Sequence, residues 1–475
     1  MLGRTRAIHF VGIGGIGMSG IAELLANLGY DVSGSDARAS SVTDRLKTLG
    51  VRVHVGHDAE HVGSADVVVV SSAIARNNPE TAEAIRRRIP VIPRAEMLAE
   101  LMRLRYGIAI AGAHGKTTTT SMVALVLERA GLDPTAVIGG RLSAFGSNAR
   151  LGRGDYMVAE ADESDRSFLK LSPSIAVVTN IDREHMESYG SWEDLQQAFV
   201  EFANKVPFYG AVIACADDAP VRGILPRVTR RVVAYGLEVG DAAPAAVTGR
   251  QLALEAFGSR AIVTNRTPDA TAELGELRLK VPGRHNMLNA LGAVAVGLEV
   301  GIPFARIAGA LAEFQGAERR FERLGEENGV LVIDDYGHHP TEIAAVIAAA
   351  RAGLDRRVVV VFQPHRYTRT QSLLPEFGAA LSGADEIVLT DIYAAGETPI
   401  PGVTLDALAS VIRASARGGV RVVPALDQIP TAVVDFARPG DLVITLGAGS
   451  IGTAGERILE ALRNRPAAAA NGGRR

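Results

Sequence analysis

The sequence has very little cysteine, no strong charge excess and no long apolar run. Its single cysteine, Cys215, excludes an internal disulfide and a thiolate metal cluster, which fits a reducing compartment. We expect Cys215 to be a core residue of a strand at residues 211–216 rather than a reactive thiol. The formal net charge of −3 argues against a nucleic-acid-binding protein, because such proteins carry a domain-wide basic excess.

No apolar stretch reaches the roughly 20 residues that a membrane span needs. Arg4 and Arg6 precede an apolar run, as in a secretory signal, but the run at residues 8–11 is short and glycines follow it. With 47% hydrophobic and 22% charged residues, the composition is that of an ordinary globular protein. The sequence therefore predicts a cytoplasmic protein with no membrane and no nucleic-acid partner.

The 475 residues exceed what one hydrophobic core supports and suggest about three domains. Short β-branched runs alternate with Ala- and Leu-rich helical stretches, a pattern typical of parallel sheets covered on both faces. We expect an α/β fold with a Rossmann-like parallel sheet at residues 1–105, a central P-loop-type ATPase domain at 106–317 and a Rossmann-like domain at 318–465. Residues 237–281 predict antiparallel strands added to the central domain, and residues 466–475 a disordered tail.

The clearest strand candidates are residues 7–11, 67–70, 108–111, 175–179, 211–214, 331–334, 358–362, 386–389 and 442–446. Ligands of parallel sheets lie at the carboxyl ends of strands. The candidate sites below all follow such strands directly.

A glycine-rich loop follows the first expected strand. It reads G-x-G-x-x-G from Gly12 to Gly17, and such glycines let backbone N–H groups approach a diphosphate at a helix N-terminus. A second strand at residues 30–34 leads to Asp36, which can accept hydrogen bonds from ribose hydroxyls. The loop alone does not distinguish NAD from a UDP-sugar, and glycines of this kind can also serve only helix–sheet packing. The same spacing at residues 447–452 illustrates how weak the pattern is.

A second phosphate-type loop lies between the strand at 108–111 and a helix expected at 119–130. It contains Gly112, Ala113, His114, Gly115, Lys116, Thr117 and Thr118. In such a loop N–H groups cradle phosphates, Lys116 bridges β- and γ-phosphate oxygens and Thr117 can bind Mg²⁺. Only two residues separate its glycines, where the standard loop has four, so a coincidental match is the alternative. Its position between strand and helix favours the phosphate site.

Acidic and histidine residues follow two further strands. Glu160 ends the strand at 156–159 and opens the run Glu-Ala-Asp-Glu-Ser-Asp, and His185 ends the run after the strand at 175–179. We predict that Glu160 and His185 hold one or two Mg²⁺ ions, with Asp162 and Glu163 as weaker candidates. The alternative is a solvated acidic loop.

Nine motifs occur in order from about residue 6 to 453: the loop at 12–20, AHGKTTTT, AEADESD, TNIDREHM, GRHNMLNA, RRFERLG, DDYGHHPTE, FQPHRYTRT and LGAGSIG. Together they resemble the Mur ligases of peptidoglycan precursor synthesis. The match is closest to members that join the lactyl carboxylate of UDP-N-acetylmuramate to L-alanine. The resemblance implies that ATP phosphorylates the carboxylate, that the amine attacks the acyl phosphate, and that ADP and phosphate are released.

The resemblance also implies roles for individual residues, with ATP and Mg²⁺ or Mn²⁺ as cofactors. Catalytic roles would belong to Lys116, His185, Arg320, His338, Arg366 and Arg369. UDP-sugar contacts would come from Gly14, Gly15, Ile16, Gly17, Met18, Ser19, Asp36, Ser71 and Ser72. Besides the second loop, ATP would contact His285, Asn286, Asn289, Arg320 and Asp335, although Asn286 could also cap a helix. Tyr336 and His338 would position the amino acid, Arg366 and Arg369 would face the lactyl carboxylate, and Thr117, Glu160 and His185 would bind metal.

The sequence departs from the family pattern at two places. The second loop begins Gly-Ala where the family commonly has Gly-Thr, a mild change because backbone amides form the cradle. Several members carry a carbamylated lysine between two metals, but the stretch near Glu201 and Phe202 has no lysine, and Lys205 is displaced by about a turn. The ligands of a second metal are therefore open.

Three other functions are alternatives to a ligase that adds a single amino acid. A sibling ligase attaches a whole recycled peptide and usually reads DDFAHHP where this chain reads DDYGHHP, so Tyr336 and Gly337 favour a single amino acid. A nicotinamide-dependent dehydrogenase would not account for Lys116, Glu160 and His185. A non-catalytic UDP-sugar sensor would not need the second loop. We expect a monomer or a weak homodimer.

Overall fold

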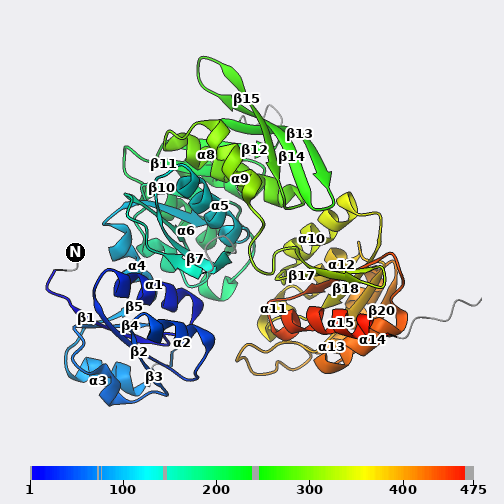
Figure 1. Cartoon of the computed structure of the whole chain (residues 1–475), viewed down its shortest axis with the longest axis horizontal. Helices are drawn as coiled ribbons and strands as arrows, with labels where there is room; N and C mark the ends of the chain where they lie inside the picture. The colour runs from blue at the N-terminus through cyan, green and yellow to red at the C-terminus, as the bar shows by residue number, and fades with distance from the viewer. Residues whose placement is uncertain (1–2, 72–73, 76, 143–146, 238–244, 466–475) are drawn as a thin grey trace, which may run out of the picture. The chain divides into compact units, whose positions relative to one another are not determined.

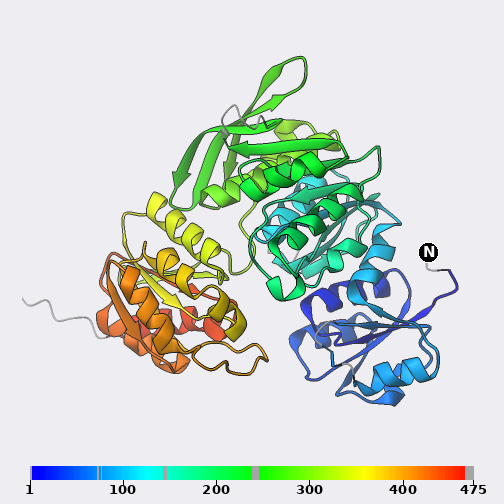
Figure 2. The same cartoon turned by 180° about the vertical axis from the view of Figure 1, so that it is seen from behind.

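The computed structural model describes residues 3–71, 74–75, 77–142, 147–237 and 245–465. Within these residues the strands form three sheets, which Figures 1 and 2 show from opposite sides. The chain divides into two compact units. The first comprises residues 1–252, 260–279 and 285–317, and the second comprises residues 253–259, 280–284 and 318–475.

The first sheet is parallel throughout, in the order β3-β2-β1-β4-β5. Its elements are β1 (Ala7–Val11), α1 (Ile16–Asn27), β2 (Asp31–Asp36), α2 (Ser41–Thr48), β3 (Arg52–Val55), η1 (Ala59–Val62), β4 (Val67–Val70), α3 (Pro79–Arg86), β5 (Val91–Pro93) and α4 (Arg94–Met102). Phe10 packs with Leu24 of α1 on one face, and Val11 packs with Val62 and Ala84 on the other. Helices therefore cover both faces, and the strand order reverses at β1, where such sheets bind ligands.

The second sheet belongs to the first unit except for residues 253–259 of β13, β14 and their connection, and it runs β15-β14-β13-β12-β11-β10-β6-β9-β7-β8. Its elements are β6 (Tyr106–Ala111), α5 (Lys116–Arg129), β7 (Thr135–Leu142), β8 (Ser147–Arg150), β9 (Tyr156–Glu160), η2 (Ser167–Lys170), β10 (Ile175–Val178), η3 (Met186–Ser188), α6 (Trp192–Asn204), β11 (Ala211–Cys215), α7 (Ala219–Ile224), η4 (Leu225–Arg227), β12 (Val232–Leu237), β13 (Val247–Glu255), β14 (Gly258–Arg266), β15 (Thr271–Leu279), α8 (Arg284–Glu299) and α9 (Phe304–Glu313). Strands β12, β11, β10, β6 and β9 pair in parallel.

The third sheet lies in the second unit, in the order β16-β17-β21-β18-β19-β20. Its elements are β16 (Glu322–Glu327), β17 (Val330–Asp335), α10 (Pro340–Gly353), β18 (Arg357–Phe362), α11 (Tyr367–Ser372), α12 (Leu374–Leu381), β19 (Glu386–Leu389), α13 (Leu405–Ser415), β20 (Gly419–Val422), η5 (Leu426–Gln428), α14 (Ile429–Phe436), β21 (Asp441–Leu446), η6 (Ser450–Thr453) and α15 (Ala454–Arg463). The edge strand β16 pairs antiparallel and the rest pair in parallel. Alternate valines of β18 face opposite sides: Val360 packs with Ile343 of α10, and Val361 packs with Ile458 of α15.

The predicted α/β fold with its parallel sheets is confirmed, and the strand candidates lie within two residues of the observed strands. The helix expected at 119–130 begins three residues earlier, at Lys116, because Gly115 adopts a left-handed φ of +79° and ends the loop there. Cys215 is a buried residue of β11, as predicted, and burial raises its pKa to about 11. Ser72 and the tail at 466–475 lie outside the described residues.

Residues 247–279 form three strands at the end of the second sheet. Two residues join β13 to β14 and four join β14 to β15, and connections this short link antiparallel neighbours, as predicted. However, β13 pairs with β12 in parallel, which the alternating sequence did not indicate. Among the described residues, no helix has both the length and the apolar character required to cross a bilayer.

Candidate active site

The first predicted loop joins β1 to α1 at the carboxyl end of the first sheet. The N–H groups of Gly12 and Ile13 both donate to the carbonyl oxygen of Ser35 at 2.9 Å, and Gly14 N–H donates to Asp36 Oδ2 at 2.8 Å. A Cβ on Gly14 would lie 2.8 Å from that same oxygen. No described side chain caps the N-terminus of α1 at Gly15, so its N–H groups and dipole suit a diphosphate.

The Asp36 side chain lies beside this loop and stabilises it through hydrogen bonds. Its Oδ2 accepts from Gly14 and its Oδ1 accepts from Arg38 N–H at 3.3 Å. A bond from Asp36 to a ribose hydroxyl stays a prediction.

The other predicted UDP-sugar residues follow the loop or end β4. Gly17 packs against the Arg94 guanidinium, which a Cβ would overlap. Met18 and Ser19 are buried in α1, and both of their N–H groups bond to Gly15 O. Ser71 follows β4, and its N–H donates to Val11 O at 3.3 Å. Ile16 is the first residue of α1. Contacts of these residues with a ligand stay predictions.

The second predicted loop joins β6 to α5 and is held by the chain that follows β10. His114 N–H donates to Asn180 Oδ1 at 2.8 Å, and the Asn180 amide and the Thr179 hydroxyl donate to His114 O at 2.9 and 2.7 Å. Gly112 has a φ of +138°, and a Cβ there would lie 2.0 Å from Thr179 Oγ1. The loop is therefore a backbone cradle at the N-terminus of a buried helix, the geometry that binds phosphate.

Lys116 begins α5, and its ammonium group is surrounded by acceptors. Its Nζ donates to Gly112 O at 2.6 Å and Ala113 O at 3.1 Å, and it lies 2.9 and 2.8 Å from the two carboxylate oxygens of Glu163. Burial lowers the pKa of Lys116, but Glu163 and Asp162 raise it by more, so the ammonium stays charged. Burial raises the pKa of Glu163 to about 7, against the effect of Lys116. Lys116 is thus a half-buried cation whose ammonium group is paired with a carboxylate.

Glu163, Glu184 and His185 form a cluster beside this loop. One ligand atom from each lies within 4.8 Å of the others. His185 adopts a left-handed φ of +55°, a conformation that residues other than glycine rarely adopt and that is frequent at functional sites. Two carboxylates and an imidazole are a donor set suited to Mg²⁺ or Mn²⁺. The predicted ligand His185 therefore belongs to a group that fits a divalent cation.

The other two predicted metal ligands are not members of this cluster. Glu160 ends β9, where it pairs in register with Ile110 just before the loop. Thr117 is the second residue of α5 and is half-buried, and Thr118 after it is buried. Metal contacts of Glu160 and Thr117 stay predictions. Lys205 follows α6 and pairs with Glu201 at 3.7 Å, and the ligands of a second metal stay open.

Three further predicted nucleotide residues lie in the first two turns of α8. Asn286 and Asn289 are buried, and His285 is half-buried. Asn289 lies against the second loop, because a Cβ on Gly115 would come within 2.5 Å of Asn289 Oδ1. Asn289 therefore packs against Gly115 of the loop, and contacts of these residues with adenine or ribose stay predictions.

In the second unit, charged residues gather where β17 ends. The two oxygens of Asp335 accept from Phe321 N–H and Gly337 N–H, both at 2.7 Å. Arg320 Nη1 donates to Glu342 Oε1 at 3.3 Å. Burial raises the pKa of Asp335 to about 6, against the effect of Arg320. Burial lowers the pKa of Arg320, but Glu342 and Asp335 raise it by more, so this half-buried guanidinium stays charged.

A row of rings lies next to these charges. The ring centroids of Tyr336 and His338 are 5.5 Å apart, those of His338 and His365 are 5.6 Å apart, and those of His365 and Tyr393 are 5.6 Å apart. Arg369 Nη1 donates to His365 Nδ1 at 3.1 Å. Burial, together with His338 and Arg369, lowers the pKa of His365 to about 3, so this ring is neutral and can accept.

Arg366 precedes α11 with a φ of +70°, and its N–H donates to Tyr393 O at 2.8 Å. The second unit thus brings Tyr336, His338, Arg366 and Arg369 together, and it adds His365 and Tyr393, which our sequence analysis missed. For His365 a signal existed, because it precedes Arg366 inside the motif FQPHRYTRT. Tyr393 lies in a loop with no motif, and no sequence signal identified it.

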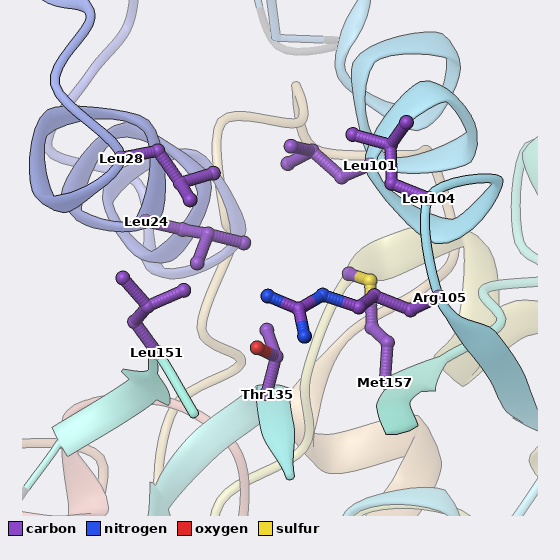
Figure 3. A pocket seen from close by; sticks show the side chains of 8 residues that line it. All are labelled: Leu24, Leu28, Leu101, Leu104, Arg105, Thr135, Leu151 and Met157. Atoms are coloured by element: carbon purple, nitrogen blue, oxygen red, sulfur yellow. The ribbon is translucent and has the colours of Figure 1, made fainter. Parts of the chain in front are cut away.

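A separate hollow of about 220 Å³ lies in the first unit, lined by Leu24, Leu28, Leu101, Leu104, Arg105, Thr135, Leu151 and Met157 (Figure 3). Arg105 extends into it and donates to Gly154 O. Its walls are largely apolar, and none of the predicted site residues lines it. The residues predicted to bind phosphate and metal therefore lie outside this hollow.

Three family models match successive parts of the chain. The "Mur ligase family, catalytic domain" matches residues 7–106, the "Mur ligase middle domain" residues 110–297, and the "Mur ligase, glutamate ligase domain" residues 319–449.

Curated relatives and solved structures agree with these matches. The chain is 54% identical to the UDP-N-acetylmuramate–L-alanine ligase of Geotalea daltonii over 98% of this chain and 100% of that protein. It is 55% identical to the ligase of the same name from Anaeromyxobacter sp. strain Fw109-5, over 96% of this chain and 98% of that protein. A solved UDP-N-acetylmuramate-alanine ligase from Thermotoga maritima superposes with a TM-score of 0.79 at 30% identity, covering 96% of this chain and 99% of that one. A murein peptide ligase from Psychrobacter arcticus gives a TM-score of 0.69 at 26% identity, covering 98% and 100%.

Proposed function

Because the chain belongs to the Mur ligase family, we propose that it is an ATP-dependent ligase that joins UDP-N-acetylmuramate to L-alanine. The bond formed is an amide between the lactyl carboxylate and the amino acid. ATP phosphorylates the carboxylate, the amine attacks the acyl phosphate, and ADP and phosphate leave. The substrate pair is taken from the names of full-length relatives at 54–55% identity.

The observation that carries the proposal is the contact between the phosphate loop and the metal-type cluster. Lys116 Nζ lies 2.9 Å from Glu163 Oε1, and Glu163 shares a cluster with Glu184 and His185. A phosphate cradle, a half-buried ammonium and a divalent-cation site are the parts that phosphoryl transfer to a carboxylate requires. A dehydrogenase or a UDP-sugar sensor has no use for this combination.

The residues of the first unit would act on the phosphates. The loop N–H groups between Gly112 and Thr118 bind the triphosphate, and Lys116 exchanges its contact with Glu163 for β- and γ-phosphate oxygens. Glu163, Glu184 and His185, with Glu160 and Thr117, would hold Mg²⁺ or Mn²⁺, which neutralises phosphate charge when bound. The glycine loop and Asp36 would hold the UDP diphosphate and its ribose.

The residues of the second unit would act on the carboxylates and the amine. Arg320 and Asp335 serve the nucleotide, and Arg366 and Arg369 offset the charge of the lactyl carboxylate and of the developing tetrahedral intermediate. Tyr336 and His338 orient the amino acid. Neutral His365 accepts from Arg369 and so fixes the direction of that guanidinium.

The sibling that attaches a recycled peptide is the second candidate within the family. Two observations favour the single amino acid. The alanine ligase of Thermotoga maritima superposes better than the murein peptide ligase of Psychrobacter arcticus, with TM-scores of 0.79 and 0.69. A Cβ at Gly337, where the sibling usually has alanine, would lie 2.9 Å from Asp335 Oδ1.

The test is ADP release by the purified protein with ATP, Mg²⁺ and UDP-N-acetylmuramate. L-alanine, glycine, L-serine and the tripeptide L-alanyl-γ-D-glutamyl-meso-diaminopimelate are supplied one at a time. We expect turnover that requires both UDP-N-acetylmuramate and an amino acid, with L-alanine preferred. Turnover only with the tripeptide would support the sibling, and no acceptor-dependent ADP release would reject the proposal.

A further inference from the structure

A fully buried carboxylate on a helix beside the first sheet takes no part in the steps above. Glu80 lies in the first turn of α3, where Asn78 Oδ1 caps its N–H at 2.9 Å, and its side chain has no solvent exposure. Burying a charge is costly unless hydrogen-bond donors surround it. The groups that donate hydrogen bonds to Glu80 therefore show which segments its charge holds in place.

Donors from four segments converge on the two oxygens of Glu80. Oε2 faces His9 Nε2 of β1 at 2.9 Å and accepts from the hydroxyl of Ser35 of β2 at 2.6 Å. Oε1 faces His57 Nδ1 at 3.1 Å and His61 Nδ1 of η1 at 3.4 Å, and it accepts from the N–H of Asp58 at 3.3 Å. An ionised carboxylate only accepts, so the three imidazole nitrogens that face it carry hydrogens.

The pKa of Glu80 agrees with this geometry. Burial raises it, but the hydrogen bonds from His9, Ser35 and His57 outweigh burial and bring it down to about 2. The group is ionised at neutral pH, and its position in the first turn of α3 adds the favourable helix dipole.

Ser35 connects this carboxylate to the glycine loop. Its hydroxyl donates to Glu80, and its carbonyl oxygen accepts the N–H groups of Gly12 and Ile13 at 2.9 Å. The next residue, Asp36, accepts Gly14 N–H through its side chain and Gly56 N–H at 2.8 Å through its carbonyl. Two successive residues of β2 thus hold the diphosphate loop on one side and the segment after β3 on the other.

We propose that Glu80 is a positioning residue for the UDP-sugar, acting through Ser35 and without touching the ligand. Satisfied buried networks of this kind specify one geometry where an apolar core would allow several. By fixing the rotamer and carbonyl direction of Ser35, Glu80 fixes where the N–H groups of Gly12 and Ile13 lie. By holding His57 and Asp58, it fixes the chain after β3 beside Asp36. This inference rests on the proposed function of the glycine loop as the UDP-sugar site.

The experiment compares wild type with Glu80→Gln, Ser35→Ala and Glu83→Gln. Glutamine at position 80 keeps the shape but turns an NH₂ group toward donors. Alanine at position 35 removes the hydroxyl that joins β2 to Glu80, together with the 3.1 Å contact of that hydroxyl to His57 Nδ1. Glu83 lies on the same helix but forms a surface pair with Arg86 at 2.7 Å, so Glu83→Gln is the matched control.

We expect KM for UDP-N-acetylmuramate to rise at least tenfold in Glu80→Gln and at least fivefold in Ser35→Ala. In both variants kcat and KM for ATP should stay within twofold of wild type, and Glu83→Gln should match wild type throughout. Calorimetric titration of UDP-N-acetylmuramate should give the same changes in Kd, independent of turnover. If Glu80→Gln does not fold, Ser35→Ala carries the test.

Unchanged KM and Kd for UDP-N-acetylmuramate in folded Ser35→Ala would overturn the inference. So would an equal rise of KM for ATP, which reports a general loss of structure. A wild-type protein that binds UDP-N-acetylmuramate but releases no ADP would instead count against the proposed function, while the Kd comparison would still decide the role of Glu80.

Discussion

Replacing Glu80 by glutamine removes a buried charge whose contribution to acid stability can be worked out. The hydrogen bonds to Glu80 lower its pKa from an ordinary 4.5 to about 2. Because the folded pKa lies below the unfolded pKa, the ionised carboxylate stabilises the folded state above pH 4.5. This stabilisation is lost as the pH falls toward 2. A shift of about 2.5 units corresponds to about 3 kcal/mol at neutral pH, of which about 2 kcal/mol is lost between pH 6 and pH 3.

The assay is hydrogen exchange followed by mass spectrometry on peptides that cover β1 and β2. After correction for intrinsic rates at each pH, protection reports the free energy of local opening. At pH 6 the free energy of local opening should be larger in wild type than in Glu80→Gln, and this difference should shrink by about 2 kcal/mol at pH 3. Glu83→Gln, which alters only an exposed pair on α3, should follow wild type at both pH values. A difference that stays constant or grows on acidification would refute the ionised, donor-saturated state of Glu80.

Three further outcomes are expected. Lys116→Ala should reduce ADP release at least 1,000-fold while Kd for UDP-N-acetylmuramate stays within twofold, because the ammonium serves phosphoryl transfer. The control Lys205→Ala, which breaks only the pair with Glu201, should release ADP at the wild-type rate. Equal turnover of both variants would exclude the role of Lys116. Chelation with EDTA should stop ADP release and excess Mg²⁺ should restore it, and turnover that survives EDTA would contradict the metal-type cluster. Cys215 should react with maleimide at pH 7.5 at least 100-fold more slowly in the native protein than in the urea-unfolded chain, because burial raises its pKa to about 11 and blocks access. Equal reaction rates would show that the thiol is accessible in the native protein.

Local sequence patterns predicted the sheets well because the strands are buried on both faces. The run of four valines in β4 and the run of β18 read as continuous apolar segments, which only doubly covered parallel strands require. The loop that contains Gly112 and Gly115 was also predictable from the sequence, since a strand, a glycine loop and a helix follow one another within a few residues. The start of α5 was placed three residues late because nothing local shows that Gly115 takes a left-handed φ.

Contacts between distant residues could not be read from the sequence. Lys116 meets Glu163 across 47 positions and His9 meets Glu80 across 71 positions, and neither pair belongs to one motif. The neighbouring arginines of the motif RRFERLG were equally ambiguous. Arg319 bonds to Asp334 at 2.6 Å and to Gly447 O at 2.7 Å and so ties the third sheet together, whereas Arg320 faces Glu342. Nothing in the motif itself shows which of the two arginines takes which role.

The most direct test of the central claim follows one oxygen atom. UDP-N-acetylmuramate labelled with oxygen-18 in the lactyl carboxylate is incubated with the protein, ATP, Mg²⁺ and L-alanine, and the released phosphate is analysed by mass spectrometry. If the carboxylate is phosphorylated before the amine attacks, one labelled oxygen passes from the carboxylate to phosphate, and we predict phosphate that carries it. Amide product accompanied by unlabelled phosphate would contradict activation through an acyl phosphate.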